Sequence, residues 1–591
     1  MCGILGHIKL EGEIDEQLFA EMLHTLAHRG PDGEGVFISE NRQIALGHKR
    51  LSFIDLSDSG KQPFISTNEQ IIVSFNGEIY NYLELKDELS KEYNFITNSD
   101  TEVIIAAYIA WGISFIDRLK GMFAIALIDR SIKQLFLIRD RFGIKPLYYG
   151  FTSNQLVFAS ELKAILKAKV FEKEINKSAL ADYFVYRYIP SPKTIWNSLY
   201  KVAPANYLKI DLVTFKTEVN EYWKLSGDDK KPSIGQLTET TKQLLLTSVK
   251  LHVRADVPIG SFLSGGYDSS ALVLWMTELG LKPYTFSIGF DQWNKSEDQF
   301  AKIVADHLAV PNDSTIANTD SLMLVDKMAE VYDEPIADIS IVPTYLVSEL
   351  ARRRVKAVVS GEGADELFGG YTWQHDYFNQ KYTVGFIQQL KNLLRPSDPV
   401  QFYAQSLAMG WFDDKELKNL LHPDYHAAIP EDVHWFYRAN YKPDLSPMKA
   451  IQHMDIKCFM GELVLTKIDR ASMANSLEVR VPFLDHHLFE TIFSTDEEIY
   501  LSKNQTKKIL FNSIKEGLPK EILDRKKQGF VGPDSYYMDI EYYKRELLNS
   551  NLVKYNVINK SYLDTLLKES YNWKLWKILI MEKWFSYWMV A

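Results

Sequence analysis

The chain has 591 residues, 46% hydrophobic and 24% charged, proportions that exclude a disordered, collagen-like or fibrous protein. Only 2 cysteines, Cys2 and Cys458, exclude a disulfide framework or a cysteine-rich zinc fold and suit a reducing cytoplasm. The net charge of -10 disfavours general binding to nucleic acid or to an anionic membrane. No apolar run approaches the roughly 18 residues of a spanning helix, and no signal peptide is visible, so we expect a cytoplasmic enzyme.

The pattern of apolar residues changes near residues 210 to 235, and short β-rich segments dominate the part of the chain before it. Each is bounded by Gly, Asn, Asp or Pro, as strands usually are. We expect strands at 71–75, 123–128, 134–138 and 156–158. The segment SGDDKKPSIG, 226–235, is polar and contains glycine and proline, so it is the best candidate for a linker.

Longer helical patterns alternate with short apolar strands after this segment. We expect strands at 257–263, 284–288 and 355–359, with helices such as 269–279 and 299–308 between them. That alternation predicts a parallel sheet covered by helices. The region from about 375 to 591 is predicted to be mostly helical, with its many aromatic side chains packed in a core.

Cys2 directly follows the initiator methionine. If Met1 is removed, Cys2 carries a thiol nucleophile and an α-amine whose pKa of about 7.7–8.0 lets it act as a base. A cysteine at position 2 is by itself more often a chance occurrence than a nucleophile.

Four polar motifs follow Cys2, at 27–35, 47–57, 75–85 and 98–104. They supply the groups that hydrolysis of a glutamine side-chain amide needs. An oxyanion could be held by Asn76 and the backbone N–H of Gly77. A guanidinium, Arg50, could clamp an α-carboxylate, and the acids Glu78 and Asp100 could receive an α-ammonium. Each motif alone is weak evidence, but together they indicate a glutamine amide hydrolase.

Residues 257–276, VPIGSFLSGGYDSSALVLWM, read as a strand, a Ser-Gly-Gly loop and a helix. Such glycines let the backbone approach a phosphate, and a helix N-terminus offers free N–H groups to it. The hydroxyls of Ser264, Ser269 and Ser270 add donors, and Asp268 could hold Mg²⁺. The chain lacks a GxxxxGK[ST] motif, which argues against a Walker-type phosphate loop. A glycine-rich turn with capping serines fits the loop alone equally well.

Residues 2 to 170 resemble the class II glutamine amidotransferases, in the motifs above and in LIRDRFGIKPLYYG and FASELKAIL. The resemblance implies an α+β N-terminal-nucleophile sandwich in which Cys2 attacks the glutamine amide and releases ammonia. It also implies that the glutamine site consists of Arg50, Asn76, Gly77, Glu78 and Asp100. Asn76 and Gly77 are then catalytic residues as well.

The segment SGGYDSS resembles the pyrophosphate-binding loop of enzymes that cleave ATP between its α- and β-phosphates. VVSGEGADELFGGY and the segments 465–486, 504–514 and 522–530 extend the resemblance, so that the whole chain is similar to the glutamine-hydrolysing asparagine synthetases. It implies that Glu362 serves acyl-adenylate formation, that Lys507 stabilises negative charge, and that Mg²⁺ is held by Asp268 and Asp365. The implied ATP-binding residues are Leu263, Ser264, Gly265, Gly266, Asp268, Ser269, Ser270, Ile288, Ser360 and Gly361.

The resemblance implies a glutaminase domain at 2–215, a linker at 216–235 and a synthetase domain at 236–591. The second domain is expected to be an α/β parallel-sheet fold with a largely helical C-terminal part. The implied reaction converts aspartate, glutamine, ATP and water to asparagine, glutamate, AMP and pyrophosphate. The alternative is the same chemistry on another carboxylate, such as a sugar uronic acid, a peptide precursor or a specialised metabolite. A homodimer is an option that the family suggests.

Two further readings are disfavoured, a non-catalytic relative and an amide-forming cyclase, because Cys2, Asp268, Glu362, Asp365 and Lys507 are all intact. The acceptor region departs from the family pattern. It reads VYDEPIADISIVPTYL at 331–346, where the best-known bacterial members have Thr-Thr-Ile-Arg. An α-carboxylate nevertheless requires a cation. The nearby cations are Arg352, Arg353, Arg354 and Lys356, none of which the sequence assigns to this role. We also expect His28 and His48 to pack near the glutaminase site, and Cys458 to be buried.

Overall fold

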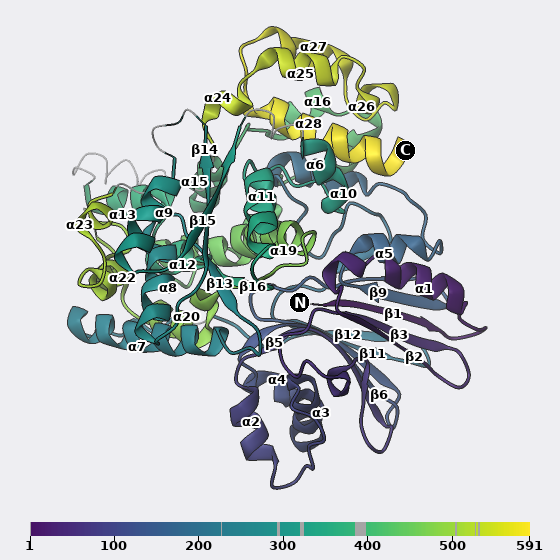
Figure 1. Cartoon of the computed structure of the whole chain (residues 1–591). Helices are drawn as coiled ribbons and strands as arrows, with labels where there is room; N and C mark the ends of the chain where they lie inside the picture. Colours follow the sequence, from purple (N-terminus) through teal and green to yellow (C-terminus); the bar gives the residue numbers. More distant parts are fainter. Residues whose placement is uncertain are drawn as a thin grey trace.

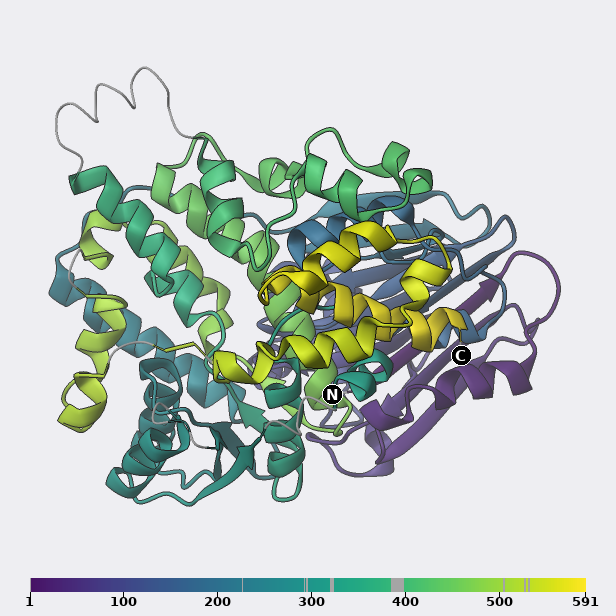
Figure 2. The same cartoon turned by 90° about the horizontal axis from the view of Figure 1, so that it is seen from above.

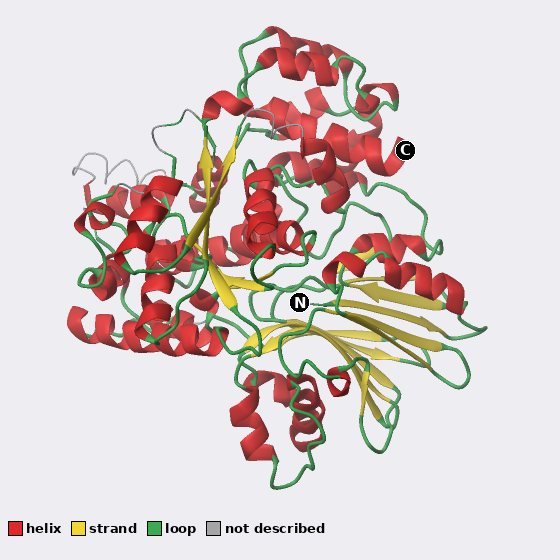
Figure 3. Ribbon diagram, in the orientation of Figure 1, coloured by secondary structure: helices red, strands yellow, loops and turns green. Residues whose placement is uncertain are grey.

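The computed structural model describes residues 2–225, 227–291, 293, 296–318, 324–383, 398–502, 505–525, 528–529 and 532–590. The segments 504–514 and 522–530, in which the sequence shows family motifs, therefore lie partly outside the described residues. Two stacked antiparallel sheets form the N-terminal half, and a parallel sheet surrounded by helices follows (Figures 1 and 3).

Each antiparallel sheet has six strands. The first has the order β10-β8-β9-β1-β3-β2, with bounds β1 Gly3–Lys9, β2 Gly33–Ile38, β3 Ile44–Arg50, β8 Tyr148–Phe151, β9 Gln155–Ala159 and β10 Leu199–Lys201. The second has the order β12-β11-β7-β6-β5-β4, with bounds β4 Phe64–Ile65, β5 Ile71–Ile79, β6 Gly121–Asp129, β7 Gln134–Arg139, β11 Asn206–Asp211 and β12 Thr217–Glu221. The four strands expected in this half correspond to β5, β6, β7 and β9.

Helices cover the outer faces of this sandwich. Ile4 on β1 packs between the two sheets, whereas its neighbour Leu5 packs on the outer side with Phe19 of α1 (Glu16–His24). This alternation is the period of two expected of a strand. The second sheet is covered by α2 (Tyr82–Leu89) and α3 (Asp100–Trp111), so every residue of β5 is buried, including the polar Ser74, Asn76 and Glu78.

The parallel sheet has five strands in the order β15-β14-β13-β16-β17. Its strands are β13 Ile259–Phe262, β14 Thr285–Phe290, β15 Asn312–Ala317, β16 Ala357–Val359 and β17 Glu478–Arg480. The connecting helices include α7 Ile234–His252, α8 Tyr267–Glu278, α9 Asp298–His307, α11 Ile341–Arg352 and α19 Leu465–Met473. The predicted parallel sheet is confirmed, with β13, β14, β16, α8 and α9 at the expected positions.

The C-terminal part is largely helical, as predicted. Its elements include α12 Ala364–Phe368, α13 Thr372–Thr383, α15 Pro399–Leu407, α16 Asp414–Leu420, α17 Trp435–Asn440, α18 Pro447–Met454, the π-helix η6 Asp455–Val464, α20 His486–Phe493, α21 Glu497–Tyr500, α22 Lys508–Ile514, α23 Lys520–Leu523, α24 Asp534–Tyr537, α25 Ile540–Leu547, α26 Asn551–Lys554, α27 Lys560–Lys568 and α28 Trp573–Phe585. Trp576 and Trp584 on α28 are 1% exposed, which confirms that these aromatic side chains form core.

The C-terminal helices lie across the boundary between the two halves (Figure 2). The indole of Trp584 donates to the carbonyl of Asp333 at 2.9 Å. Tyr183 on α6 (Lys177–Tyr186) donates to the carbonyl of Lys577 at 2.8 Å. Helix α28 is therefore fastened both to the N-terminal half and to the segment that leads into α11. Among the described residues, no helix is long and apolar enough to span a membrane.

The segment 216–235 is not uniformly irregular. It begins with β12, which pairs with β11 and extends the second antiparallel sheet by one strand. It ends at Ser233, whose side chain caps α7 in a capping box with Gln236. The linker expected at 216–235 therefore contains the edge strand β12, and the polar stretch 226–235 follows this strand.

Candidate active sites

Cys2 lies immediately before β1, beside the buried side chain of Asn76 on β5. Its backbone N–H donates to Asn76 Oδ1 at 2.9 Å. The residue is 7% exposed, and burial raises the pKa of its thiol. The side-chain amide nitrogen of Asn76 is also buried and has no hydrogen-bond partner among the described residues. The structure thus places an unused amide donor next to the predicted nucleophile, as an oxyanion site requires.

Gly77, next to Asn76, is a position that only glycine fits. Its φ is 155°, and a Cβ there would lie 2.0 Å from the carbonyl oxygen of Met122 on β6. A side chain would therefore push the neighbouring strand away. The predicted pair of Asn76 and Gly77 sits on a buried central strand of the sheet.

Arg50 is held entirely by backbone carbonyls. Its guanidinium donates to Ser57 O at 2.9 Å and to Ile54 O at 3.3 Å, and also bonds Asp55 O. A Cβ on Gly60 would lie 2.2 Å from Arg50 Nη2, so the loop closes tightly over this group. No carboxylate forms an ion pair with Arg50 within the described parts of the chain. Its charge therefore remains available for an anionic ligand.

Glu78 and Asp100 are both buried at the end of β5. Asp100 accepts a hydrogen bond from the backbone N–H of Ile79 at 3.0 Å, and burial raises its pKa to about 6. Burial also raises the pKa of Glu78, which pairs with Arg480 at 3.3 Å. Arg480 lies on β17 of the parallel sheet, about 400 residues further along the chain, and the sequence analysis did not identify it.

The phosphate-loop sequence forms the predicted strand, turn and helix between β13 and α8. Gly265 has a φ of 70°, and a Cβ there would lie 2.5 Å from Phe300 Cβ, which explains this glycine. The backbone N–H of Ser264 donates to Ser269 Oγ at 3.1 Å, and that of Gly266 donates to Ser264 Oγ at 3.3 Å. The buried hydroxyl of Ser270 has no partner among the described residues.

A second loop, Ser360 to Glu362, follows β16, the strand beside β13. Both loops therefore lie at the carboxyl ends of neighbouring parallel strands, where ligands of such sheets bind. A Cβ on Gly361 would lie 2.9 Å from Asp268 Cβ, so the two loops nearly touch. Leu263 and Ile288, the predicted adenosine contacts, are each 2% exposed at the ends of β13 and β14.

Glu362 has a buried carboxylate oxygen, Oε2, without a hydrogen-bond partner in the described structure. Burial raises the pKa of Glu362, and the Ser360 hydroxyl and the charge of Lys467 partly offset that effect. An unsatisfied buried carboxylate is costly unless a ligand completes its environment. The structure thus brings Glu362 to the predicted reaction centre.

Lys507 joins both predicted metal residues. Its ammonium lies 2.5 Å from Asp268 Oδ2 and 2.7 Å from Asp365 Oδ1. Burial alone would lower its pKa, but these two carboxylates raise it above the usual value. The described residues contain no group of three or more metal-ligating side chains. Two convergent carboxylates beside a phosphate loop nevertheless fit Mg²⁺, which binds few protein oxygens together with substrate phosphates.

A buried ion-pair cluster connects Cys2 to the second half. Arg29 is 0% exposed and donates to Cys2 O at 3.1 Å. Its guanidinium also bonds Glu161 at 2.7 Å and Asp469 on α19 at 2.9 Å. Arg470 extends the cluster, 2.9 Å from Glu161. These pairs cannot be predicted from the sequence, since only the fold brings Arg29, Glu161 and Asp469 together.

Arg29→Met is expected to lower the free energy of unfolding by about 3–5 kcal/mol, because it leaves Asp469 buried without its main partner. The midpoint of urea unfolding measures this effect. Arg42→Ala is the matched control, since Arg42 pairs with Glu16 on the surface, and its loss should cost less than about 1 kcal/mol. Equal shifts for both variants would contradict a structural role for the cluster.

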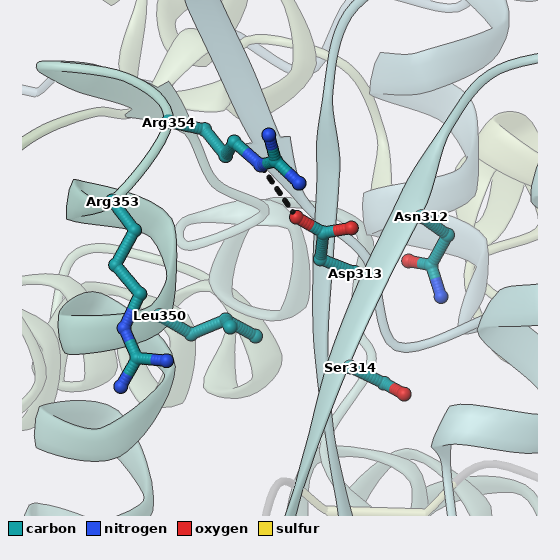
Figure 4. Close-up of a pocket in the computed structure, with 6 residues that line it drawn as sticks. All are labelled: Asn312, Asp313, Ser314, Leu350, Arg353 and Arg354. Atoms are coloured by element: carbon teal, nitrogen blue, oxygen red, sulfur yellow. Dashed lines mark hydrogen bonds and ion pairs between the residues drawn. The ribbon is translucent and has the colours of Figure 1, made fainter.

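The cations that follow α11 do not reach the phosphate loops. Arg354 pairs with Asp313 at 3.1 Å, Arg353 lies 3.7 Å from Glu349, and Lys356 pairs with Asp32 at 2.6 Å. Arg353 and Arg354 border a hollow of about 430 Å³ (Figure 4). This hollow lies at the start of β15, that is, at the amino ends of the strands. It is on the opposite edge of the sheet from the phosphate loops, so these residues are excluded as the acceptor's cation.

His28 and Cys458 behave as predicted. His28 bonds Glu161 at 3.1 Å within the cluster around Arg29. His48 is buried and donates from Nε2 to the carbonyl of Phe75 at 3.1 Å, and burial lowers its pKa to about 3. Cys458 is 0% exposed and burial raises its pKa far above the usual value, so it is packed as a small hydrophobic side chain.

Comparisons with known proteins agree with this arrangement. The family described as "Glutamine amidotransferase domain" matches residues 1–223, and "Asparagine synthase" matches residues 240–586. Asparagine synthetase (glutamine-hydrolyzing) 1 of Bacillus subtilis is 34% identical over 99% of this chain and 96% of its own length. A Methanocaldococcus jannaschii protein named as an asparagine synthetase (glutamine-hydrolyzing) is 37% identical over 82% of this chain and 100% of its own length. Amidase chry2 of Gibberella zeae is 31% identical over 95% of this chain and 93% of its own length.

The two family matches define the class, a glutamine amidotransferase domain joined to an asparagine synthase domain. The chain belongs to the glutamine-hydrolysing asparagine synthetase family.

Proposed function

We propose that the protein transfers ammonia from glutamine to a carboxylate through an acyl-AMP, with aspartate as the acceptor and ATP and Mg²⁺ as cofactors. The observation that supports this proposal most is that the chain brings together two separate sets of the predicted site residues. One is Cys2 with the unused Asn76 amide, and the other is Lys507 with Asp268 and Asp365. Residues 2–215 hydrolyse glutamine, and residues 236–591 form the amide.

In the first step the Cys2 thiol loses its proton to the free α-amine, and its sulfur attacks the glutamine amide carbon. The Asn76 amide and the Gly77 N–H hold the oxygen that becomes negative. The C–N bond then breaks, ammonia takes the proton and leaves, and a thioester remains. Water hydrolyses the thioester to glutamate. Arg50 binds the α-carboxylate of glutamine, and Glu78 and Asp100 bind its ammonium.

The pH dependence of glutamine binding tests the role of Asp100. Because burial raises its pKa to about 6, Asp100 is mostly ionised at pH 7 and mostly protonated at pH 5. Only the ionised form attracts an ammonium, so the KM for glutamine is expected to rise about 10-fold from pH 7 to pH 5. Asp100→Asn should raise the KM at pH 7 and flatten this dependence. An unchanged profile in the variant would assign the titration to another group.

In the second step the acceptor carboxylate attacks the α-phosphorus of ATP, and pyrophosphate leaves. Ser264, Ser269, Ser270 and the N-terminus of α8 bind the phosphates. Bound Mg²⁺ would neutralise phosphate charge, and Asp268 and Asp365 would hold it. Lys507 balances the charge of the phosphates and the carboxylates. AMP is a much better leaving group than oxide, which is why the carboxylate is activated.

In the third step ammonia attacks the acyl carbon, and AMP leaves with the electron pair of the broken C–O bond. The nitrogen must lose a proton on the way to a neutral amide. The Oε2 of Glu362, which has no partner among the described residues and belongs to a carboxyl whose pKa burial raises, would take that proton, in addition to the role in acyl-adenylate formation that the resemblance implies. The amide and AMP are the products of this site.

Acceptor-dependent release of pyrophosphate tests the proposal. The enzyme is supplied with glutamine, ATP and Mg²⁺ and screened over aspartate, uronic acids and other small carboxylates. We expect AMP and pyrophosphate in equal amounts with aspartate, together with asparagine. Formation of ADP and phosphate instead would reject the phosphate-loop interpretation.

A second candidate acceptor is another carboxylate, such as a sugar acid or a specialised metabolite. The segment 331–346 favours it, because this segment has no arginine to face an α-carboxylate. Similarity to a fungal protein named as an amidase is compatible with it. Release of pyrophosphate with another acid, and none with millimolar aspartate, would establish this alternative.

A further inference from the structure

Three charged side chains meet beside the acceptor segment 331–346. Lys467 on α19 donates to Ser340 Oγ at 2.7 Å and lies 3.7 Å from Asp338 Oδ1. Ser340 also bonds Asp338. The side chains of Lys467 and Asp338 are 13% and 14% exposed, so this pair is only narrowly accessible. The third side chain is Arg187, from the N-terminal half.

Arg187 is fixed to the same segment through its backbone. It caps α6 in the left-handed conformation, with a φ of 73°, and its carbonyl accepts the N–H of Ala337 at 2.9 Å. The guanidinium lies 5.8 Å from the centre of the Phe459 ring, and Nη1 lies 3.8 Å from the sulfur of Met409. Among the described residues, no carboxylate forms an ion pair with it. Burial tends to raise the pKa of Asp338, but the charges of Lys467 and Arg187 lower it.

Arg187 is half-buried against a sulfur and an aromatic ring. A guanidinium in such surroundings is stabilised when an anion completes its planar set of donors. Asp338 supplies only partial compensation, because it is already engaged by Ser340 and Lys467. The two positive charges of Arg187 and Lys467 face one negative charge, that of Asp338. One more carboxylate would neutralise this group.

A series of contacts connects Arg187 with the predicted nucleotide site. The Phe459 ring contacts Tyr371 at 5.7 Å and Trp373 at 5.8 Å between centres. Tyr371 follows Gly370, where a Cβ would lie 1.9 Å from Asp365 Oδ1 and 2.2 Å from Lys507 Cε. On the other side, the charge of Lys467 acts on Glu362. Two aromatic side chains, Phe459 and Tyr371, thus connect Arg187 to the cluster of Asp365 and Lys507.

We propose that Arg187 binds the non-reacting carboxylate of an amino-acid acceptor, and that Asp338, positioned by Lys467 and Ser340, binds its ammonium. This inference rests on the proposed function and names the residues that select the acceptor. An aspartate has one reacting carboxylate, one further carboxylate and one ammonium. Arg187 and Asp338 match the last two groups in charge and number. The cation that the segment 331–346 lacks thus comes from residue 187, across the boundary between the halves.

The test compares aspartate with 3-aminopropanoate, which has the same reacting carboxylate and ammonium but lacks the second carboxylate. Activity is measured with ammonium chloride as the nitrogen source, so that glutamine hydrolysis does not enter. In Arg187→Gln, the KM for aspartate is expected to rise about 10- to 100-fold, with kcat changed much less. The preference of the wild type for aspartate over 3-aminopropanoate should shrink by the same factor. Arg187→Lys should restore part of the affinity.

The KM for ATP and the rate of glutamine hydrolysis report folding and should stay within about 2-fold in both variants. Arg353→Gln is the matched control, because Arg353 lies at the opposite edge of the sheet. This substitution should leave kcat and the KM values for aspartate and ATP unchanged. An unchanged KM for aspartate in Arg187→Gln, or an equal loss with 3-aminopropanoate, would overturn the inference. If Arg187→Gln fails to fold, an unchanged KM for aspartate in Arg187→Lys would overturn the inference. Wild-type enzyme that turns over a uronic acid but not aspartate would instead reject the proposed acceptor.

Discussion

Cys2→Ala is expected to abolish amide synthesis from glutamine while leaving synthesis from ammonium intact. Removing a covalent nucleophile should lower glutamine-dependent turnover by more than about 10³-fold. The substitution should not disturb the fold, because both strong contacts of residue 2 use its backbone. Its N–H bonds Asn76 and its carbonyl accepts from Arg29, and alanine keeps both.

The measurement is asparagine formation with glutamine and, separately, with a high concentration of ammonium chloride. Cys458→Ala is the matched control, because Cys458 is the other cysteine of the chain and is fully buried in the C-terminal half. It should retain both activities, apart from a small loss of stability. If Cys2→Ala loses both activities with a native circular dichroism spectrum, the two sites are not separable.

Residues close together in the sequence were the ones that could be predicted. Asn76, Gly77 and Glu78 are consecutive on β5, so their common position follows from one strand. Ser264 to Ser270 likewise span the turn after β13 and the first residues of α8. A short motif constrains its own backbone strongly, because glycine and capping side chains determine the local conformation. The local positions of these residues could therefore be predicted before the fold was known.

Residues that meet only through the fold could not be predicted. Glu78 pairs with Arg480, and Arg29 with Asp469, over more than 400 positions in the chain. Nothing in the local pattern of either member indicates the other. Arg187 shows the same limit, since the sequence points to cations near 352–356, whereas the half-buried guanidinium comes from the helix end at 187.

Two strands of the parallel sheet were also missed, for a related reason. β15 is an edge strand with the polar sequence NDSTIA, and β17 has only 3 residues. Neither shows the apolar run of a buried parallel strand. Pairing to β14 and β16 provides their stability, so they are defined by neighbours far away in the sequence.

Asp268→Asn and Asp365→Asn are expected to lower acceptor-dependent pyrophosphate release by at least about 100-fold. The two carboxylates together balance Lys507, which lies 2.5 Å from one and 2.7 Å from the other. Either substitution removes one negative charge and one oxygen ligand from this point. Lys507 would largely neutralise the remaining carboxylate. Mg²⁺ bound to the phosphates would then have little ligation from the protein.

Glutamine hydrolysis should survive in both variants, because Cys2, Asn76 and Arg50 belong to the other half of the molecule. Asp313→Asn is the matched control. Asp313 is an acid of the same sheet paired with Arg354, but it lies at the amino ends of the strands and should leave the rate within about 2-fold. Raising the Mg²⁺ concentration should recover part of the activity of Asp268→Asn if its defect is weakened metal binding. Full pyrophosphate release by either variant at low Mg²⁺ would show that these carboxylates do not hold the metal. Within the cluster of Lys507, Asp268 and Asp365, only Lys507 would then contact the phosphates.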